Sequence, residues 1–260
     1  MATLYHVPLS PFCRKVRLSL AEKKIEVELV EERYWEADAD FLRRNPAAKV
    51  PVLKLDGRMM AESAAICEYI EETRPAPSLL PTSPEDKYEV RRLVGWFDDK
   101  FHNEVTSKLL YERVNKKVTG QGYPDSRNVK DGAKAIKYHL DYMGWLLDQR
   151  RWLAGDAMTL ADFAAAAHLS ALDYISDVDW NRSAAVKDWY AKNNCEGLIG
   201  DIACLLSAKG EESEYHDDNR KRKQEMDFRI AKNKVQLHNI LRKQKDLGSS
   251  DDRNNERKTD

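Results

Sequence analysis

The stretch PLSPFCRKV, residues 8–16, carries a serine and a cysteine three positions apart at the expected start of a helix. Pro11 suits the first helical turn, because a proline there sacrifices no hydrogen bond. Backbone N–H groups and the positive end of the helix dipole would meet at Ser10, and such a point stabilises an anion such as a thiolate. A dithiol redox motif needs a cysteine where Ser10 stands. The loop therefore excludes a two-cysteine cycle within this motif but suits a bound thiol cofactor.

Two roles are open to Ser10. As an N-cap, its side-chain oxygen would accept a hydrogen bond from the first helical turn. As an activating group, its hydroxyl would donate to a cofactor thiolate, a bond worth roughly 1.5–3 kcal/mol because the acceptor is charged. Cys13 falls inside the helix, where we predict a buried thiol rather than a nucleophile.

Around this loop, residues 1–80 alternate between strand and helix patterns. TLYHVPL and VELVEE predict strands, and VPVLKLDGRMMAE predicts two strands around a tight turn at Asp56-Gly57. SAAICEYIEETR predicts a helix whose inward face carries Ala65, Ile66, Tyr69 and Ile70. This order of elements predicts a small α/β domain with its sheet covered by helices.

The stretch RPAPSLLPTSP is rich in proline and serine and predicts a linker to a second domain. Beyond it, residues 85–205 show helical periods and predict an all-helical domain. TLADFAAAAHLSALDYI opens with a capping box formed by Thr159 and Asp162. Its alanines permit close helix packing, so we expect it to be the buried central helix. Two further apolar stripes comprise Val90, Val94, Phe97 and Phe101, and Ile136, Leu140, Met143 and Leu147.

The composition limits the class of protein. The chain has 260 residues, of which 42% are hydrophobic and 33% charged, with a formal net charge of −1. This balance argues against a nucleic-acid-binding body, and no apolar run is long enough for a membrane span. The sequence begins without a secretory signal pattern. The four cysteines, Cys13, Cys67, Cys195 and Cys204, lack disulfide or metal spacing, so we expect reduced thiols, a cytoplasmic location and no metal.

Residues 211–260 change character, because apolar residues become sparse and charges dominate. Met226, Ile230, Leu237 and Leu241 nevertheless share one side of a helical wheel that is rich in lysine and arginine. Two interpretations stay open for this tail: a partly helical basic segment that contacts an anionic surface, and a solvated, disordered extension.

Taken together, four motifs resemble the cytosolic glutathione transferase family: PLSPFCRKVRLSLAEKKI, NPAAKVPVL, ESAAICEYIEE and TLADFAAAAH. The resemblance spans about residues 3–191. It implies a thioredoxin-like N-terminal domain joined to an all-helical C-terminal domain, here with a charged C-terminal extension. It also implies a cis Val50–Pro51 bond that turns the Val50 backbone toward glutathione. Glu62 and Ser63 would bind the γ-glutamyl end, with Ser10 at the thiol.

A narrower set of motifs resembles the alphaproteobacterial glutathione-transferase-like proteins that bind FtsZ, the tubulin-like division protein. These motifs are EERYWE, VRRLVGWFDDKF, KYHLDYMGWLL, RRWLAGD and ALDYISDVDW. The resemblance implies a homodimer that regulates FtsZ filaments rather than a glutathione enzyme. After KDWYAKNNC the chain departs from the pattern of both groups.

Two functions therefore follow as hypotheses. The first is a dimeric, non-catalytic regulator that binds FtsZ filaments during cell division. The alternative is a glutathione transferase, catalysing conjugation or a glutathione-dependent isomerisation, in which Ser10 stabilises the glutathione thiolate. The sequence does not identify an electrophile, although Trp96, Phe101 and Tyr111 are candidates to line its pocket or to pack in the core.

Overall fold

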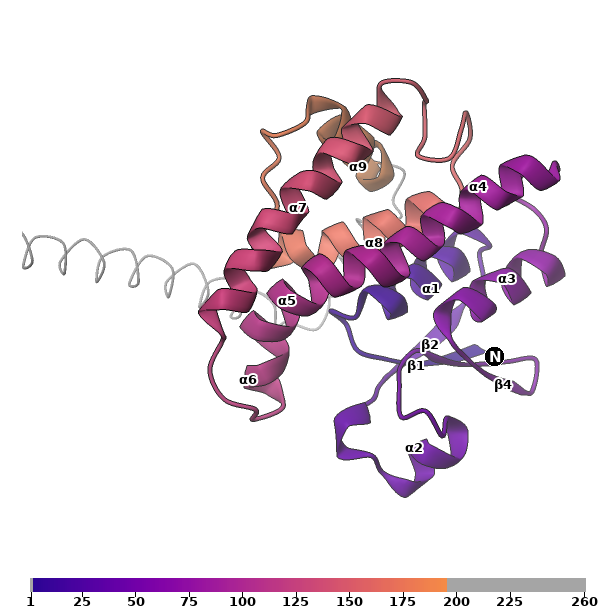
Figure 1. The fold of residues 1–260 in the computed structure, drawn as a ribbon. Coiled ribbons are helices and arrows are strands. Elements are labelled where there is room, and N and C mark those ends of the chain that lie inside the picture. The colour runs from indigo at the N-terminus through magenta and orange to yellow at the C-terminus, as the bar shows by residue number, and fades with distance from the viewer. Residues whose placement is uncertain (1, 196–260) are drawn as a thin grey trace, which may run out of the picture. The chain divides into compact units, whose positions relative to one another are not determined.

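The computed structural model describes residues 2–195 (Figure 1). Its N-terminal part contains a four-stranded sheet with three α-helices and a short 3-10 turn. In chain order these elements are β1 (Ala2–His6), α1 (Pro11–Glu22), β2 (Val27–Glu31), η1 (Tyr34–Glu36), α2 (Ala39–Arg44), β3 (Val52–Leu55), β4 (Arg58–Ala61) and α3 (Ser63–Thr73).

The sheet is mixed, with the strand order β2-β1-β3-β4. β1 runs parallel to β2 and antiparallel to β3, and β4 closes the edge as a hairpin partner of β3. Leu4 pairs with Leu53 across the two central strands, and both side chains are fully buried. Asp56 and Gly57 both have positive φ, which is the geometry of the predicted tight turn.

Helices α1 and α3 lie together between the sheet and the helical part, whereas α2 lies on the other side of the sheet (Figure 1). The predicted inward face of α3 is partly wrong. Ile66 and Ile70 are buried as expected, but Ala65 is exposed and Tyr69 is only half-buried. The buried face passes instead through Cys67, because α1 packs against that side of the helix.

The C-terminal part is all helical. Residues 84–118 form one continuous helical segment made of α4 (Pro84–Gly95), the π-helical η2 (Trp96–Thr106), α5 (Ser107–Leu110), the π-helical η3 (Tyr111–Asn115) and α6 (Lys116–Val118). Three further helices follow, namely α7 (Ser126–Leu147), α8 (Leu160–Tyr174) and α9 (Ala184–Cys195). Residues 74–83, between α3 and α4, contain no helix or strand.

Helix α8 is the central helix of this part, as predicted. All its residues from Leu160 to Leu172 are buried, and it packs against α1, α4 and η2. Thr159 and Asp162 form the predicted capping box at its start. The thioredoxin-like sheet followed by a helical part confirms the predicted fold class. The predicted tail, residues 211–260, lies outside the described residues, and within residues 2–195 no helix is long and apolar enough to cross a membrane.

Candidate functional site

A pocket of about 560 Å³ opens between the sheet and η2. The sheet part contributes the segments that precede β3 and α3, and η2 forms the opposite wall. The pocket contains four of the five predicted site residues, Val50, Pro51, Glu62 and Ser63. The complete lining is Phe12, Lys49, Val50, Pro51, Glu62, Ser63, Ala64, Asp98, Asp99, His102 and Asn103.

The segment before β3 presents backbone to the pocket. The Val50–Pro51 peptide bond is cis, as the family resemblance implied. The preceding turn is held by Asn45, whose side chain is 2.8 Å from the Lys49 carbonyl oxygen that it donates to. Lys49, Val50 and Pro51 line the pocket in sequence, so the backbone of this segment is placed where a peptide-like ligand would bind as it does to a strand edge.

Glu62 and Ser63 stand at the junction between β4 and α3. Glu62 is exposed and has φ 68°, a left-handed conformation that an L-residue adopts only when its surroundings impose it. Ser63 is 6% exposed and begins α3, so the first N–H groups of this helix lie at the pocket. A carboxylate side chain next to a helix N-terminus can bind an ammonium and a carboxylate of the same ligand.

Ser10 caps α1. Its Oγ accepts a hydrogen bond from the Cys13 backbone N–H at 3.4 Å, and its backbone conformation is extended, as expected of an N-cap. Phe12, two residues later, lines the pocket, whereas Ser10 itself is not among the lining residues. The cap interpretation of Ser10 is therefore visible in the geometry. A role toward a thiolate stays a prediction.

Cys13 is fully buried, in line with the expectation that it is not a nucleophile. Burial raises the pKa of its thiol to about 11, although the Ser10 hydroxyl, the Val7 backbone and Arg17 favour the thiolate. The second buried thiol, Cys67, also has a raised pKa because of burial. Both thiols are therefore protonated at neutral pH.

The wall formed by η2 contains functional residues that the sequence analysis did not identify. Asp98, Asp99, His102 and Asn103 all line the pocket. Asp98 also forms an ion pair with Lys15 of α1, whose side chain is only 2% exposed. The adjacent acidic residues within VGWFDDKF were a signal for this wall. The sequence did not predict which way these residues point, because η2 is π-helical and an α-helical wheel therefore misplaces its side chains.

Behind this wall, imidazole rings pack around Phe12. The Phe12 ring lies 4.9 Å from His102 and 5.6 Å from His168, measured between ring centroids. His168 is held by Thr106, with 2.9 Å between Oγ1 and Nδ1, and its Nε2 lies 3.9 Å from Asp98 Oδ1. Burial lowers the pKa of His102, against the opposing effect of Asp98 and Asp99, and lowers that of His168 strongly. Both rings are therefore neutral at pH 7.

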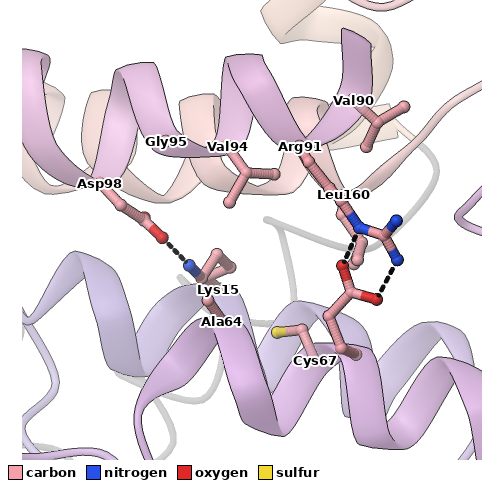
Figure 2. Close-up of a pocket in the computed structure, with 10 residues that line it drawn as sticks. Lys15, Ala64, Cys67, Val90, Arg91, Val94, Gly95, Asp98 and Leu160 are labelled. Atoms are coloured by element: carbon pink, nitrogen blue, oxygen red, sulfur yellow. Dashed lines mark hydrogen bonds and ion pairs between the residues drawn. The ribbon is translucent and has the colours of Figure 1, made fainter. Parts of the chain in front are cut away.

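A smaller pocket of about 310 Å³ adjoins the first and shares Ala64 and Asp98 with it (Figure 2). It lies between α3 and α4, and Figure 2 shows two ion pairs across it, Lys15 with Asp98 and Glu68 with Arg91. Its other lining residues are Cys67, Val90, Val94, Gly95 and Leu160, so its floor is largely apolar.

The three aromatic candidates for an electrophile pocket have different environments. Phe101 is fully buried and belongs to the core. Trp96 is half-buried and donates its indole N–H to His139 at 3.1 Å. Tyr111 is 37% exposed and donates its hydroxyl to Gln121. None of the three lines either pocket. Among residues 2–195, no group of three or more His, Cys, Asp or Glu is placed to hold a metal ion.

Comparison with known proteins gives relatives over most of the described chain. Residues 4–78 match the family described as glutathione S-transferase, N-terminal domain. FtsZ-localized protein A of Caulobacter vibrioides is 45% identical over 194 residues, which cover 73% of this chain and 85% of that protein. A probable maleylacetoacetate isomerase of Caenorhabditis elegans is 35% identical over 58% of this chain and 69% of its own length.

Solved structures show the same similarity. A glutathione S-transferase from Rhodospirillum rubrum F11 superposes with a TM-score of 0.72 at 49% identity, covering 74% of this chain and 86% of that one. FzlA from C. crescentus superposes with a TM-score of 0.75 at 44% identity, covering 77% of this chain and 91% of that one.

Proposed function

The chain belongs to the glutathione S-transferase family, and we propose that it is a cytoplasmic, homodimeric regulator of FtsZ filaments. The observation that carries this proposal is the 45% identity to FtsZ-localized protein A across 85% of that protein. Identity at this level over most of both chains indicates that the two proteins share their architecture. The TM-score of 0.75 to FzlA from C. crescentus supports the same conclusion.

A non-catalytic role is compatible with a retained fold, because function depends on specific sites rather than on architecture. In this proposal the activity lies on the surface of the molecule. A two-fold symmetric dimer presents the same surface twice, so one dimer can contact two filament subunits or two filaments. Linking two contacts in this way strengthens binding without any new contact chemistry.

Co-sedimentation tests this function. Purified protein is mixed with FtsZ polymerised by GTP, and the pellet is compared with one prepared with GDP, in which filaments do not form. The proposal predicts that the protein enters the pellet at micromolar concentration only when filaments are present. If it stays in the supernatant in both conditions, the proposal is wrong.

The larger pocket supports a second candidate, glutathione conjugation or glutathione-dependent isomerisation. Its charges suit a ligand that carries both carboxylates and an ammonium. Lys49 and the N-terminus of α3 are positive, whereas Glu62 and Asp99 are negative and Asp98 is paired with Lys15. In this candidate Ser63 and Glu62 bind the γ-glutamyl end, Val50 and Pro51 bind the peptide backbone, and Ser10 donates to the thiolate. The relative named as a probable maleylacetoacetate isomerase adds support.

Calorimetry with glutathione tests the second candidate. Binding in the millimolar range or tighter is expected, weakened at least about tenfold by Ser63→Ala because a buried partner of the ligand is lost. Turnover of an electrophile such as 1-chloro-2,4-dinitrobenzene, lost in Ser10→Ala, would assign catalysis as well as binding. If titrating glutathione into the protein gives the same heat as titrating it into buffer, the transferase candidate is wrong. The proposal that the protein binds FtsZ filaments is not affected by that result.

A further inference from the structure

The connection between α6 and α7 exposes two large apolar side chains. Val118, at the end of α6, is 58% exposed, and Tyr123, in the following loop, is 95% exposed. The loop turns at Gly120 and Gly122, whose φ angles are 69° and 95°, a conformation that favours glycine. It lies at the periphery of the helical part, at the lower left of Figure 1.

Both ends of this loop are held by one buried carboxylate. Glu112 of η3 is 2% exposed and accepts hydrogen bonds from the Asp125 backbone N–H at 2.7 Å and from the Asn128 side chain at 2.9 Å. It also forms an ion pair with Lys116 at 2.7 Å. Glu112 therefore joins the start of α7 to α6, and the loop presents Tyr123 from an anchored base.

Four exposed cations flank these apolar side chains. We define the α6–α7 basic corner by its two apolar and four basic members: Val118, Tyr123, Lys117, Arg127, Lys130 and Lys134. The last three follow one another at intervals of three and four residues, so they share one face of α7. The buried residues of α7, among them Ile136 and Leu140, lie on the opposite face.

The cations of this corner are not neutralised by the described chain. Within residues 2–195, none of the four forms an ion pair, although two carboxylates, Asp125 and Asp131, lie in the same stretch. Like charges one turn apart on a helix repel each other and lower its stability. Arg127, Lys130 and Lys134 therefore carry a cost that an anionic surface would offset.

We propose that the α6–α7 basic corner binds an anionic lipid surface, with Tyr123 and Val118 in the headgroup region and the four cations facing lipid phosphates. Basic residues are attracted to an anionic bilayer, and aromatic side chains with a polar end favour its interface. The contact is peripheral, because it uses one exposed corner of a folded protein. It goes beyond filament binding and does not depend on it.

The shape of the corner favours a lipid surface over an acidic peptide. None of its six residues lines either of the two pockets, and the most exposed apolar side chain, Tyr123, stands on a loop. A peptide gains affinity by lying in a groove or along a strand edge, where its side chains are enclosed. A protruding apolar side chain between cations instead suits a soft surface that it can enter.

Co-sedimentation of the full chain with sucrose-loaded vesicles tests this contact. The wild type is expected to pellet with vesicles that contain phosphatidylglycerol, less so at high salt, and to stay in solution with phosphatidylcholine alone. Lys130→Glu combined with Lys134→Glu should weaken binding at least about tenfold, because two attractive charges become repulsive. Tyr123→Ser should weaken it about threefold or more, whereas Tyr123→Trp should strengthen it, because tryptophan favours the interface.

A matched control separates this corner from a general effect of charge. Lys54→Glu combined with Arg58→Glu makes the same change of charge on the exposed side of the β3–β4 hairpin and should bind vesicles as the wild type does. Circular dichroism should show the native helical signal in every variant, because each altered side chain is exposed. If the Lys130 and Lys134 variant does not fold, the two Tyr123 variants decide alone.

Several results would overturn the proposal. A wild-type chain that stays in solution with anionic vesicles does so, and if it binds soluble polyglutamate instead, the corner serves an acidic protein partner. Vesicle binding that survives the reversal at Lys130 and Lys134 places the contact elsewhere in the chain. Equal binding by the wild type and both Tyr123 variants contradicts entry of the loop into the headgroup region. Co-sedimentation with FtsZ filaments is measured separately and is unaffected by these outcomes.

Discussion

At the scale of single residues, Ser10 illustrates how one hydroxyl can serve two roles. A serine oxygen has two acceptor lone pairs and one donor hydrogen. In the structure an acceptor site receives the Cys13 N–H group, and the same hydroxyl also favours the thiolate form of Cys13, so a bound thiol would compete with Cys13 for the donor hydrogen. Ser10 can therefore cap α1 and also donate a hydrogen bond to a thiolate. The second role depends on whether the protein binds a thiol ligand.

Substitutions of Ser10 can separate the two roles. Ser10→Ala removes both and should lower the unfolding free energy by about 1 kcal/mol, the typical value of an N-cap. Ser10→Asp keeps a good cap but repels an anion, so it should unfold within about 0.5 kcal/mol of the wild type while losing any thiolate stabilisation. Urea denaturation and the ultraviolet absorbance of bound glutathione thiolate measure the two effects. Equal stability of all three proteins contradicts the capping role.

Residues of the pocket were predictable where short motifs resemble those of the glutathione transferase family. That resemblance implied Val50, Pro51, Glu62 and Ser63, and all four line one pocket. Asp98, Asp99 and His102 face the same space from a helix more than 30 residues further along the chain. Their approach depends on how the helical part packs on α1, which no local pattern encodes.

At the scale of elements, the start of α8 depends on one buried carboxylate. Asp162 Oδ1 accepts from the Leu153 N–H at 3.0 Å and from the Trp189 indole at 2.9 Å. Its Oδ2 accepts from the Thr159 N–H at 2.9 Å and from the Thr159 hydroxyl at 3.0 Å. One side chain thus joins α8, the preceding loop and α9. The capping box was predicted, but the bond to Trp189 was not, because it spans 27 residues.

Removing this carboxylate should be costly. Asp162→Ala leaves four buried donors without an acceptor and is expected to lower the unfolding free energy by roughly 3 kcal/mol or more. Thr159→Ala, which removes only one member of the box, should cost about 1 kcal/mol. Chemical denaturation followed by tryptophan fluorescence gives both values. A loss below about 1 kcal/mol in Asp162→Ala contradicts the account of α8.

The same helices should make stability sensitive to acid. His168 of α8 is 1% exposed, beside Asp98, Lys15 and His102, and burial lowers its pKa well below the ordinary value of 6.5. Below about pH 6.5 the unfolded chain binds a proton at this residue and the folded chain does not. The unfolding free energy therefore decreases as pH falls, by up to about 1.4 kcal/mol per pH unit for this group.

His168→Asn removes the titrating ring while keeping a polar atom near Thr106. The variant is expected to be less stable than the wild type at pH 7.5, yet to show a shallower loss between pH 6.5 and pH 5. His102 and His139, whose pKa values are also lowered by burial, remain to titrate in both proteins. Urea denaturation at several pH values measures the slopes. If the unfolding free energies of the wild type and His168→Asn fall with the same slope between pH 6.5 and pH 5, His168 does not contribute to the acid sensitivity.

At the scale of the whole molecule, the proposed homodimer would connect the fold to filament regulation. A dimer that contacts two filaments should bundle them, whereas a monomer can bind one filament but cannot link two. A variant shown by sedimentation velocity to be monomeric is therefore expected to co-sediment with FtsZ filaments without raising their light scattering at 90°. The wild-type protein should raise the scattering under the same conditions. Full bundling by a demonstrably monomeric variant contradicts this link.

The fold class was predictable because motif order and hydrophobic period both follow from local sequence. A surface for a partner was not, since no local pattern says which exposed residues meet another chain. An isolated glycine in a helical pattern looks the same whether a neighbouring helix packs against it, as Leu109 does at Gly132, or nothing does, as at Gly95.

The central claim is that this member of the glutathione S-transferase family binds FtsZ filaments, and co-sedimentation with a mass balance measures it most directly. Increasing amounts of protein are pelleted with a fixed amount of polymerised FtsZ, and both fractions are quantified. The account predicts saturable recovery in the pellet at micromolar concentration, absent when GDP replaces GTP. Recovery that does not exceed the GDP control at any concentration contradicts it.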